Sequence, residues 1–183
     1  MQRLRTVFAS LAISALGCAA LPVYTDFDGA EDFSKLSTFA WLTTVQQPTG
    51  DVRIDNPLLD ARVRTATDEQ LTAQGYLKVP EDRADFLVGY HLSLKTKLDV
   101  YMINSHYGYG RRGYYELPET TVDEYEQGTL LLDVVSARSR KLVWRGWTSK
   151  RVGTLGTPEE RDARVREVVN AILAEFPPTP AEN

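Results

Sequence analysis

The chain of 183 residues contains a single cysteine, Cys18, and this limits the ways in which its fold can be stabilised. One thiol cannot form an intramolecular disulfide, and a zinc site built from cysteines needs two or more of them at short spacing. The fold must therefore rest on an apolar core. Hydrophobic residues make up 43% of the sequence and charged residues 25%, proportions that suit one packed domain.

The position of Cys18 also predicts how the chain is processed. Arg3 and Arg5 precede an uncharged stretch, Thr6 to Leu16. This stretch has the length of the apolar region of a secretory signal and is too short to span a bilayer as a helix. The segment Ala15-Leu16-Gly17-Cys18 then resembles the lipobox of bacterial lipoproteins. We therefore expect residues 1–17 to be a signal peptide and Cys18 to be the lipid-bearing first residue of the mature protein.

The residues after Cys18 favour one membrane over the other. Ala19 and Ala20 follow, without an Asp at the second mature position. By resemblance to enterobacterial lipoproteins, this favours the periplasmic face of the outer membrane. Acyl chains on Cys18 hold a protein to a membrane because each buried methylene contributes ~0.8 kcal/mol. The alternative is an ordinary signal peptide cleaved at a site such as the one after Ala20, with Cys18 incidental.

Apolar periodicity predicts the secondary structure of the remaining chain. Asn56-Pro57 supplies a cap and a first-turn proline for one helix, and Gly75 supplies its left-handed stop. Thr157-Pro158-Glu159-Glu160 is a capping box that opens a second helix, which Pro177-Pro178 ends. Strands are expected at Val23–Phe27, Thr38–Leu42, Ala84–Leu98, Leu130–Val135 and Leu142–Ser149, the last two forming a hairpin through Ala137–Arg140.

These elements predict the fold class. The order β-β-α-β-β-β-α indicates an α+β fold, with a largely antiparallel sheet and two helices packed on one face. The domain is expected to cover residues 23–178, after a lipid-anchored N-terminus at 18–22 and before a tail at 179–183. In the second helix we expect an apolar face of Val165, Val168, Val169, Ile172, Leu173 and Phe176, with Arg161, Arg164, Arg166 and Glu167 pointing away from it.

Six short stretches follow one another in a specific order behind the lipobox. They are Asp32-Phe33-Ser34-Lys35, Thr38-Phe39-Ala40-Trp41, Asn56-Pro57-Leu58-Leu59, Ala84-Asp85-Phe86-Leu87-Val88, Glu126-Gln127-Gly128-Thr129-Leu130 and Leu142-Val143-Trp144-Arg145-Gly146-Trp147. Together they resemble the bacterial lipoproteins called domain of unknown function 4136, over about Val23 to Pro178. The resemblance implies a periplasm-facing α+β domain on a lipid anchor, with no established enzyme activity or cofactor. No catalytic residue is therefore carried over.

The residues themselves give little support for catalysis. His91 and His106 are the only histidines, and no acidic pair stands at a spacing that completes a metal site with them. The sequence contains no Gly-x-Ser-x-Gly elbow and no phosphate loop. We expect no enzyme activity, no cofactor and no metal. The acidic residues Glu116, Glu119, Asp123, Glu124 and Glu126 do not follow the pattern of a calcium loop, so they predict a solvated acidic loop.

The net charge of −4 gives no field that attracts nucleic acid. The most unusual segment is Asp99–Leu117, which is rich in glycine and expected to be a long loop. Tyrosine and arginine dominate binding surfaces, so this loop is a candidate partner-binding site. The alternative is a plain connection between two strands. The candidate binding residues are Tyr101, Tyr107, Tyr109, Arg111, Arg112, Tyr114 and Tyr115.

The sequence therefore predicts a non-catalytic scaffold or binding module, lipid-anchored in the envelope. Its partners are the membrane, through Cys18, and an envelope protein, lipid or glycan. The alternative function is a carrier or assembly factor for a lipid or glycan of the outer membrane. A deep apolar pocket between helices and sheet favours the carrier, and a filled core with an exposed tyrosine patch favours the scaffold.

Overall fold

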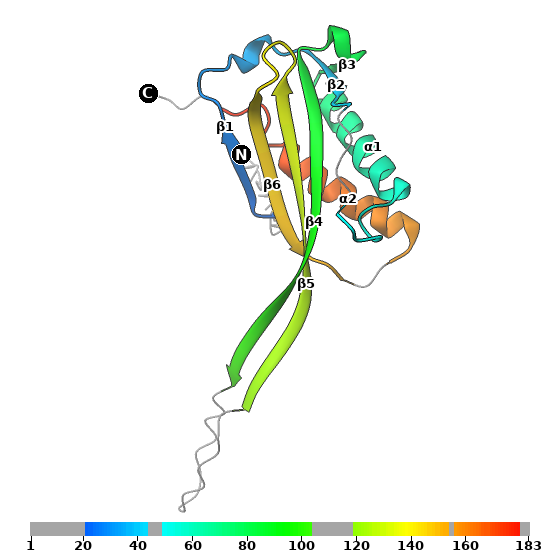
Figure 1. Cartoon of the computed structure of the whole chain (residues 1–183), viewed down its shortest axis with the longest axis vertical. Coiled ribbons are helices and arrows are strands. Elements are labelled where there is room, and N and C mark those ends of the chain that lie inside the picture. The colour runs from blue at the N-terminus through cyan, green and yellow to red at the C-terminus, as the bar shows by residue number, and fades with distance from the viewer. Residues whose placement is uncertain (1–20, 44–48, 104–118, 154–155, 180–183) are drawn as a thin grey trace, which may run out of the picture.

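The computed structural model describes residues 21–43, 49–103, 119–153 and 156–179 (Figure 1). In this part of the chain six strands form one sheet in the order β1-β6-β5-β4-β2-β3. Two helices cover one face of it, which confirms the predicted α+β fold. The strands are β1 (Val23–Phe27), β2 (Thr38–Trp41), β3 (Leu77–Lys78), β4 (Phe86–Ile103), β5 (Glu119–Ser136) and β6 (Leu142–Arg151); the helices are α1 (Pro57–Ala73) and α2 (Pro158–Leu173).

The sheet is antiparallel over its larger part and parallel at one edge. β1, β6, β5 and β4 pair antiparallel, whereas β2 pairs parallel with both β4 and β3. The two-residue strand β3 was not predicted. It forms because the backbone N–H groups of Leu77 and Val79 donate to the carbonyls of Ser37 and Phe39, each at 2.9 Å. A pairing of this kind depends on residues distant in sequence and leaves no local pattern.

Both helices begin where their capping residues predict, and α1 also ends there, whereas α2 ends at Leu173, before Phe176 and the predicted stop at Pro177-Pro178. Asn56 Oδ1 accepts from the Leu59 N–H at 2.9 Å, and Gly75 takes a φ of +97° after α1. Thr157 and Glu160 form the capping box of α2. Each of these capping signals involves residues close in sequence, so it predicts a helix boundary without knowledge of the tertiary contacts.

The helices lie side by side and run in the same direction. Arg62 near the start of α1 pairs with Asp162 near the start of α2, and Arg166 Nη2 lies 3.5 Å from Glu69 Oε2 one to two turns further on. At the other end, the side chain of Gln74 donates to the carbonyl of Leu173 at 2.7 Å. Both helices therefore start at the same end of the sheet.

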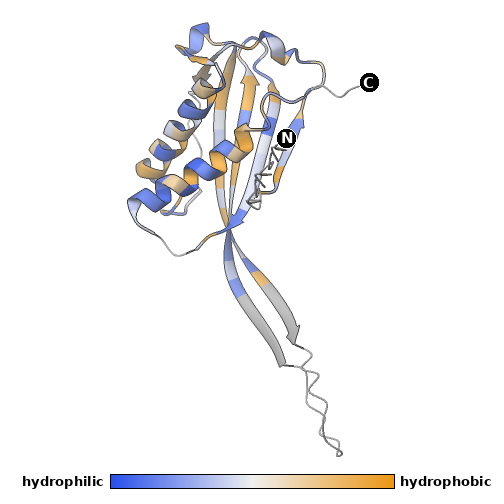
Figure 2. Cartoon of the chain, turned by 180° about the vertical axis from the view of Figure 1, so that it is seen from behind, coloured by the Kyte–Doolittle hydropathy of each residue, from blue (hydrophilic) through white to orange (hydrophobic). Residues whose placement is uncertain are grey.

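The core fills the space between the helices and the sheet at the end where the helices finish. Phe86, Trp144 and Phe176 are almost fully buried, and the ring centroids of Trp144 and Phe176 are 5.1 Å apart. Ile172 and Leu173 of α2 are buried against this cluster, as the predicted apolar face requires. Figure 2 shows hydrophobic and hydrophilic residues alternating along both helices.

β4 and β5 are longer than predicted and continue beyond the rest of the sheet as a two-stranded ribbon, Thr96–Ile103 paired with Glu119–Glu126 (Figure 1). The long loop predicted at Asp99–Leu117 is therefore wrong over its first five residues, and the acidic loop is wrong from Glu119 onward. Charged residues suit such a ribbon because its cross-strand backbone bonds need no buried face. Glu116 and the rest of the predicted loop lie outside the described residues.

Candidate binding groove

A hollow of about 1010 Å³ lies between the helices and the sheet, near the start of the ribbon. An adjoining recess of about 200 Å³ shares several of its lining residues and reaches deeper between α1, α2 and the sheet. We call the hollow and the recess together the groove. The residues that line both parts are Leu59, Leu92, Gly128, Val152, Arg164 and Val165.

Apolar side chains from both helices and from the sheet form the walls of the groove. Leu59 and Val63 come from the first turns of α1, and Val165 and Val168 from the middle of α2. Leu92 of β4 belongs to the sheet face that carries the core, because side chains two apart in a strand share a face. The groove is thus a continuation of the core layer, in which the side chains of the helices and the sheet do not fill the space between them.

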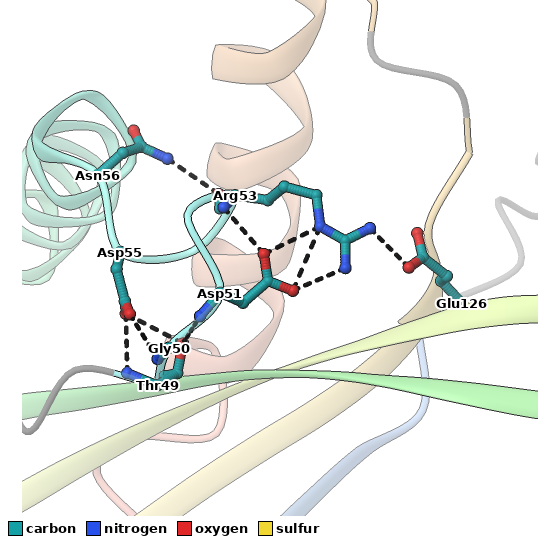
Figure 3. Close-up of polar contacts among 7 residues, drawn as sticks. All are labelled: Thr49, Gly50, Asp51, Arg53, Asp55, Asn56 and Glu126. Atoms are coloured by element: carbon teal, nitrogen blue, oxygen red, sulfur yellow. Dashed lines mark hydrogen bonds and ion pairs between the residues drawn. The ribbon is translucent and has the colours of Figure 1, made fainter.

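A loop before α1 closes one side of the groove (Figure 3). Asp55 holds its start by accepting hydrogen bonds from the N–H groups of Thr49 (3.0 Å) and Gly50 (2.8 Å). Asp51 accepts from the backbone and the guanidinium of Arg53, whose Nη2 lies 2.6 Å from Asp51 Oδ2. Arg53 Nη1 also lies 2.6 Å from Glu126 Oε1, so the loop is tied to β5.

These contacts shift the pKa values of three charged side chains in the loop. Side-chain hydrogen bonds from Arg53, followed by one from its backbone N–H, lower the pKa of Asp51 to about 2. Hydrogen bonds from Asp51 and Glu126 raise the pKa of the Arg53 guanidinium. The backbone N–H of Thr49 lowers the pKa of Asp55. The charged forms that hold this wall in place therefore persist well below neutral pH.

Arginines surround the groove, and their partners differ. Arg53 and Arg62 are paired with acids, as described above. Arg161 Nε donates to the backbone carbonyl of Gly156 at 3.0 Å. Arg164 is half-buried, and no residue in the described part of the chain forms a hydrogen bond or an ion pair with it. Arg164 is thus a cation in the groove that no described residue binds or neutralises.

The prediction that Arg161 and Arg164 point away from the buried face of α2 is wrong. Both side chains are partly buried and line the hollow. The helical pattern places them beside the apolar stripe, but it cannot tell whether that flank meets solvent or a wall of the groove. The only signal in the sequence is an arginine next to a stripe of valines. That signal alone does not reveal a groove, because a long charged side chain can also cover an apolar surface.

His91, the histidine considered from the sequence that the structure describes, lies outside the groove. His91 is on the opposite sheet face, where its side chain is 65% exposed; its Nε2 lies 3.7 Å from Asp133 Oδ2. Asp133 is held by Arg145 through two hydrogen bonds of 2.7 and 2.8 Å. Within the described residues, no group of three metal-binding side chains is found.

The remaining candidates lie in the ribbon or outside the described residues. Tyr101 lies in β4, where its backbone pairs with Thr121. Cys18, His106, Tyr107, Tyr109, Arg111, Arg112, Tyr114 and Tyr115 lie outside the described residues. The predictions attached to them stay predictions.

The fold and the groove define a class of protein: an α+β domain with two parallel helices on one face of a mixed sheet, and a partly apolar hollow between the two layers. Residues 23–178 match the family model described as Domain of unknown function (DUF4136). The chain belongs to this family, as its ordered sequence stretches predicted. No curated protein matches the sequence significantly.

Solved structures resemble the chain at low sequence identity, and one of those described below shares its fold. A PDZ domain protein from Parabacteroides distasonis ATCC 8503 aligns with a TM-score of 0.55 and 12% identity, over 87% of this chain and 36% of that one. The chain thus spans about a third of that protein's length. The PelC dodecamer from Paraburkholderia phytofirmans aligns more weakly, with a TM-score of 0.47 and 10% identity, over 84% of this chain and 95% of that one. Neither α1 nor α2, the helices of the described residues, is long and apolar enough to cross a membrane.

Proposed function

We propose that this protein is a non-catalytic, lipid-anchored envelope module that binds an apolar ligand in the groove. The observation that carries the proposal is a hollow of about 1010 Å³ with apolar walls, set between helices and sheet. Ligand pockets are usually concave and lined mainly by apolar side chains, with volumes of about 300–1,000 Å³. A groove of this kind favours the carrier alternative over a scaffold with a filled core.

The chemistry of the walls supports binding rather than catalysis. Leucine, valine and arginine dominate the lining, and none of them transfers protons near neutral pH. Glu126, an acid in the hollow, is already engaged by Arg53. The lipid anchor at Cys18 and the periplasmic location complete the proposal, since a carrier needs to stay near the membrane whose lipids or glycans it handles. The tyrosine-rich segment remains a second candidate surface for a protein partner.

The proposal is tested by filling the groove. The neutral fluorescent probe N-phenyl-1-naphthylamine should bind the full-length protein saturably, with one probe per chain, because it buries its rings against Leu59 and Leu92. Val165→Trp places a large side chain in the groove and should abolish this binding. Leu77→Trp, on the exposed strand β3, adds the same ring elsewhere and should leave the binding unchanged.

Two results would contradict the proposal. Saturable binding that survives in the Val165→Trp protein would place the probe outside the groove. Failure of the unmodified protein to bind the probe, in a sample whose cooperative melting shows that it is folded, would remove the groove as an apolar binding site.

A further inference from the structure

Arg164, a cation in the groove, has neither a counter-charge nor a hydrogen-bond partner among the described residues. Arg164 lines both the hollow and the recess, and it is half-buried between Val165, Leu59 and the end of β6. Other arginines of the described chain have acidic partners at short range: Arg145 has Asp133, and Arg53 has Asp51 and Glu126. A charge withdrawn from water is favourable when it is paired. The guanidinium of Arg164 is therefore available to pair with an anionic ligand.

The surroundings of Arg164 strengthen its preference for an anion. α1 and α2 run parallel, so the positive ends of both helix dipoles lie at the end of the body that carries the groove. Arg161, one turn before Arg164, is bonded to a carbonyl rather than to a carboxylate, and therefore keeps its full positive charge. Two acids at this end are already paired with other arginines: Asp162 with Arg62, and Glu126 with Arg53.

We propose that the groove binds a single-chain amphiphile with an anionic head group, with the head at Arg164 and the apolar chain in the recess. This inference rests on the proposed function, because it assigns a ligand class to the same groove. The walls that flank Arg164 are Leu59, Leu92, Val165 and Val168, which offer the chain contact but offer few partners to a sugar or a peptide backbone. The guanidinium fork binds carboxylate and phosphate heads alike.

The test compares three amphiphiles of equal chain length. Dodecanoate has a carboxylate head, dodecyl phosphate has a phosphate head, and monolauroylglycerol has a neutral head. Each is titrated below its micelle-forming concentration into the full-length protein, and displacement of N-phenyl-1-naphthylamine reports its affinity. At least one anionic amphiphile should bind about tenfold or more tightly than the neutral one, since hydrogen bonds to charged groups are the stronger kind. The comparison of carboxylate with phosphate identifies the head group.

Variants of the arginine complete the test. Arg164→Gln should lower the affinity for the anionic amphiphile to that of the neutral one, and leave neutral binding unchanged. Arg164→Lys should keep part of the preference, because it keeps the charge but loses the fork. Arg166→Gln is the matched control, since Arg166 is on the same helix, is 53% exposed and lines neither part of the groove. Its affinities should equal those of the unmodified protein.

The outcomes separate this inference from the proposed function. Equal affinity for all three amphiphiles, abolished by Val165→Trp, would overturn the anionic head group and leave the apolar groove standing. An anionic preference that survives in Arg164→Gln would overturn the role of Arg164. No binding of any amphiphile or of the probe would overturn both proposals together.

Discussion

Gly146 sits where β6 passes beneath α2, and the packing there leaves no room for a side chain. A Cβ atom at this position would lie 2.8 Å from Ile172 Cγ2 and still closer to the ring of Trp144. Both neighbours are fully buried, so neither can move into solvent. The glycine is required here by the distance between layers rather than by its backbone angles.

Replacement of Gly146 by alanine should therefore destabilise the fold by overpacking. We expect Gly146→Ala to lower the free energy of unfolding by ~1–3 kcal/mol, measured by urea denaturation. Gly89→Ala is the control, because a Cβ there has Leu42 Cδ2 as its nearest neighbour, at an ordinary 3.7 Å. A Gly146→Ala protein as stable as the control would mean that Trp144 and Ile172 can repack.

At the scale of the elements, the sequence predicted what local signals encode. Asn56, Gly75 and the Thr157 capping box placed both helices, and strict alternation placed the core end of β4 and the β5–β6 hairpin. The ribbon was missed because Thr96, Lys97 and Leu98, where it begins, are exposed, so burial imposes no apolar period on them. Arg164 was misplaced because helical spacing assigns a side chain to a flank, whereas the presence of a groove beside that flank depends on how α2 and the sheet diverge.

The loop Thr49–Asn56 shows how a short irregular element becomes a fixed wall, and its stability should depend on pH. Asp51 has a depressed pKa, about 2 against an ordinary 3.8, so its ion pair with Arg53 contributes fully above pH 4. That contribution is lost as the pH falls from about 4 toward 2. The NMR shift of the Arg53 amide, which donates to Asp51, should change with a midpoint near pH 2.

A matched variant separates the aspartate from general acid unfolding. Asp51→Asn should remove the transition and leave the Arg53 amide at one shift throughout the same pH range, because the amide side chain does not titrate. A midpoint at the ordinary 3.8 in the unmodified protein would show that Arg53 does not hold the carboxylate.

At the scale of the whole molecule, the predicted lipid anchor at Cys18 lies close in sequence to the folded domain. The described residues begin at Leu21, and β1 follows almost at once at Val23. If Cys18 carries lipid, as the lipobox resemblance predicts, the sheet lies close to the membrane surface.

The anchor is tested by removing its thiol. Cys18→Ser should abolish incorporation of labelled palmitate and shift the protein from the membrane fraction to the soluble or uncleaved form, because two or three acyl chains supply the binding energy. The melting temperature of the released domain should stay the same, since Cys18 lies outside the folded residues described here. Unchanged labelling and membrane partition would refute the lipoprotein assignment.

The position of β1 at the edge of the sheet determines when this strand can pair during folding. β1 pairs only with β6 among the described strands, and the Thr148 hydroxyl donates to the carbonyl of Pro22, 126 residues earlier, at 2.6 Å. At ~5–20 residues per second, a ribosome makes these partners about 6 to 25 s apart. Closing so long a loop also delays the pairing. The strand nearest Cys18 is therefore the first to be synthesised and among the last to join the sheet.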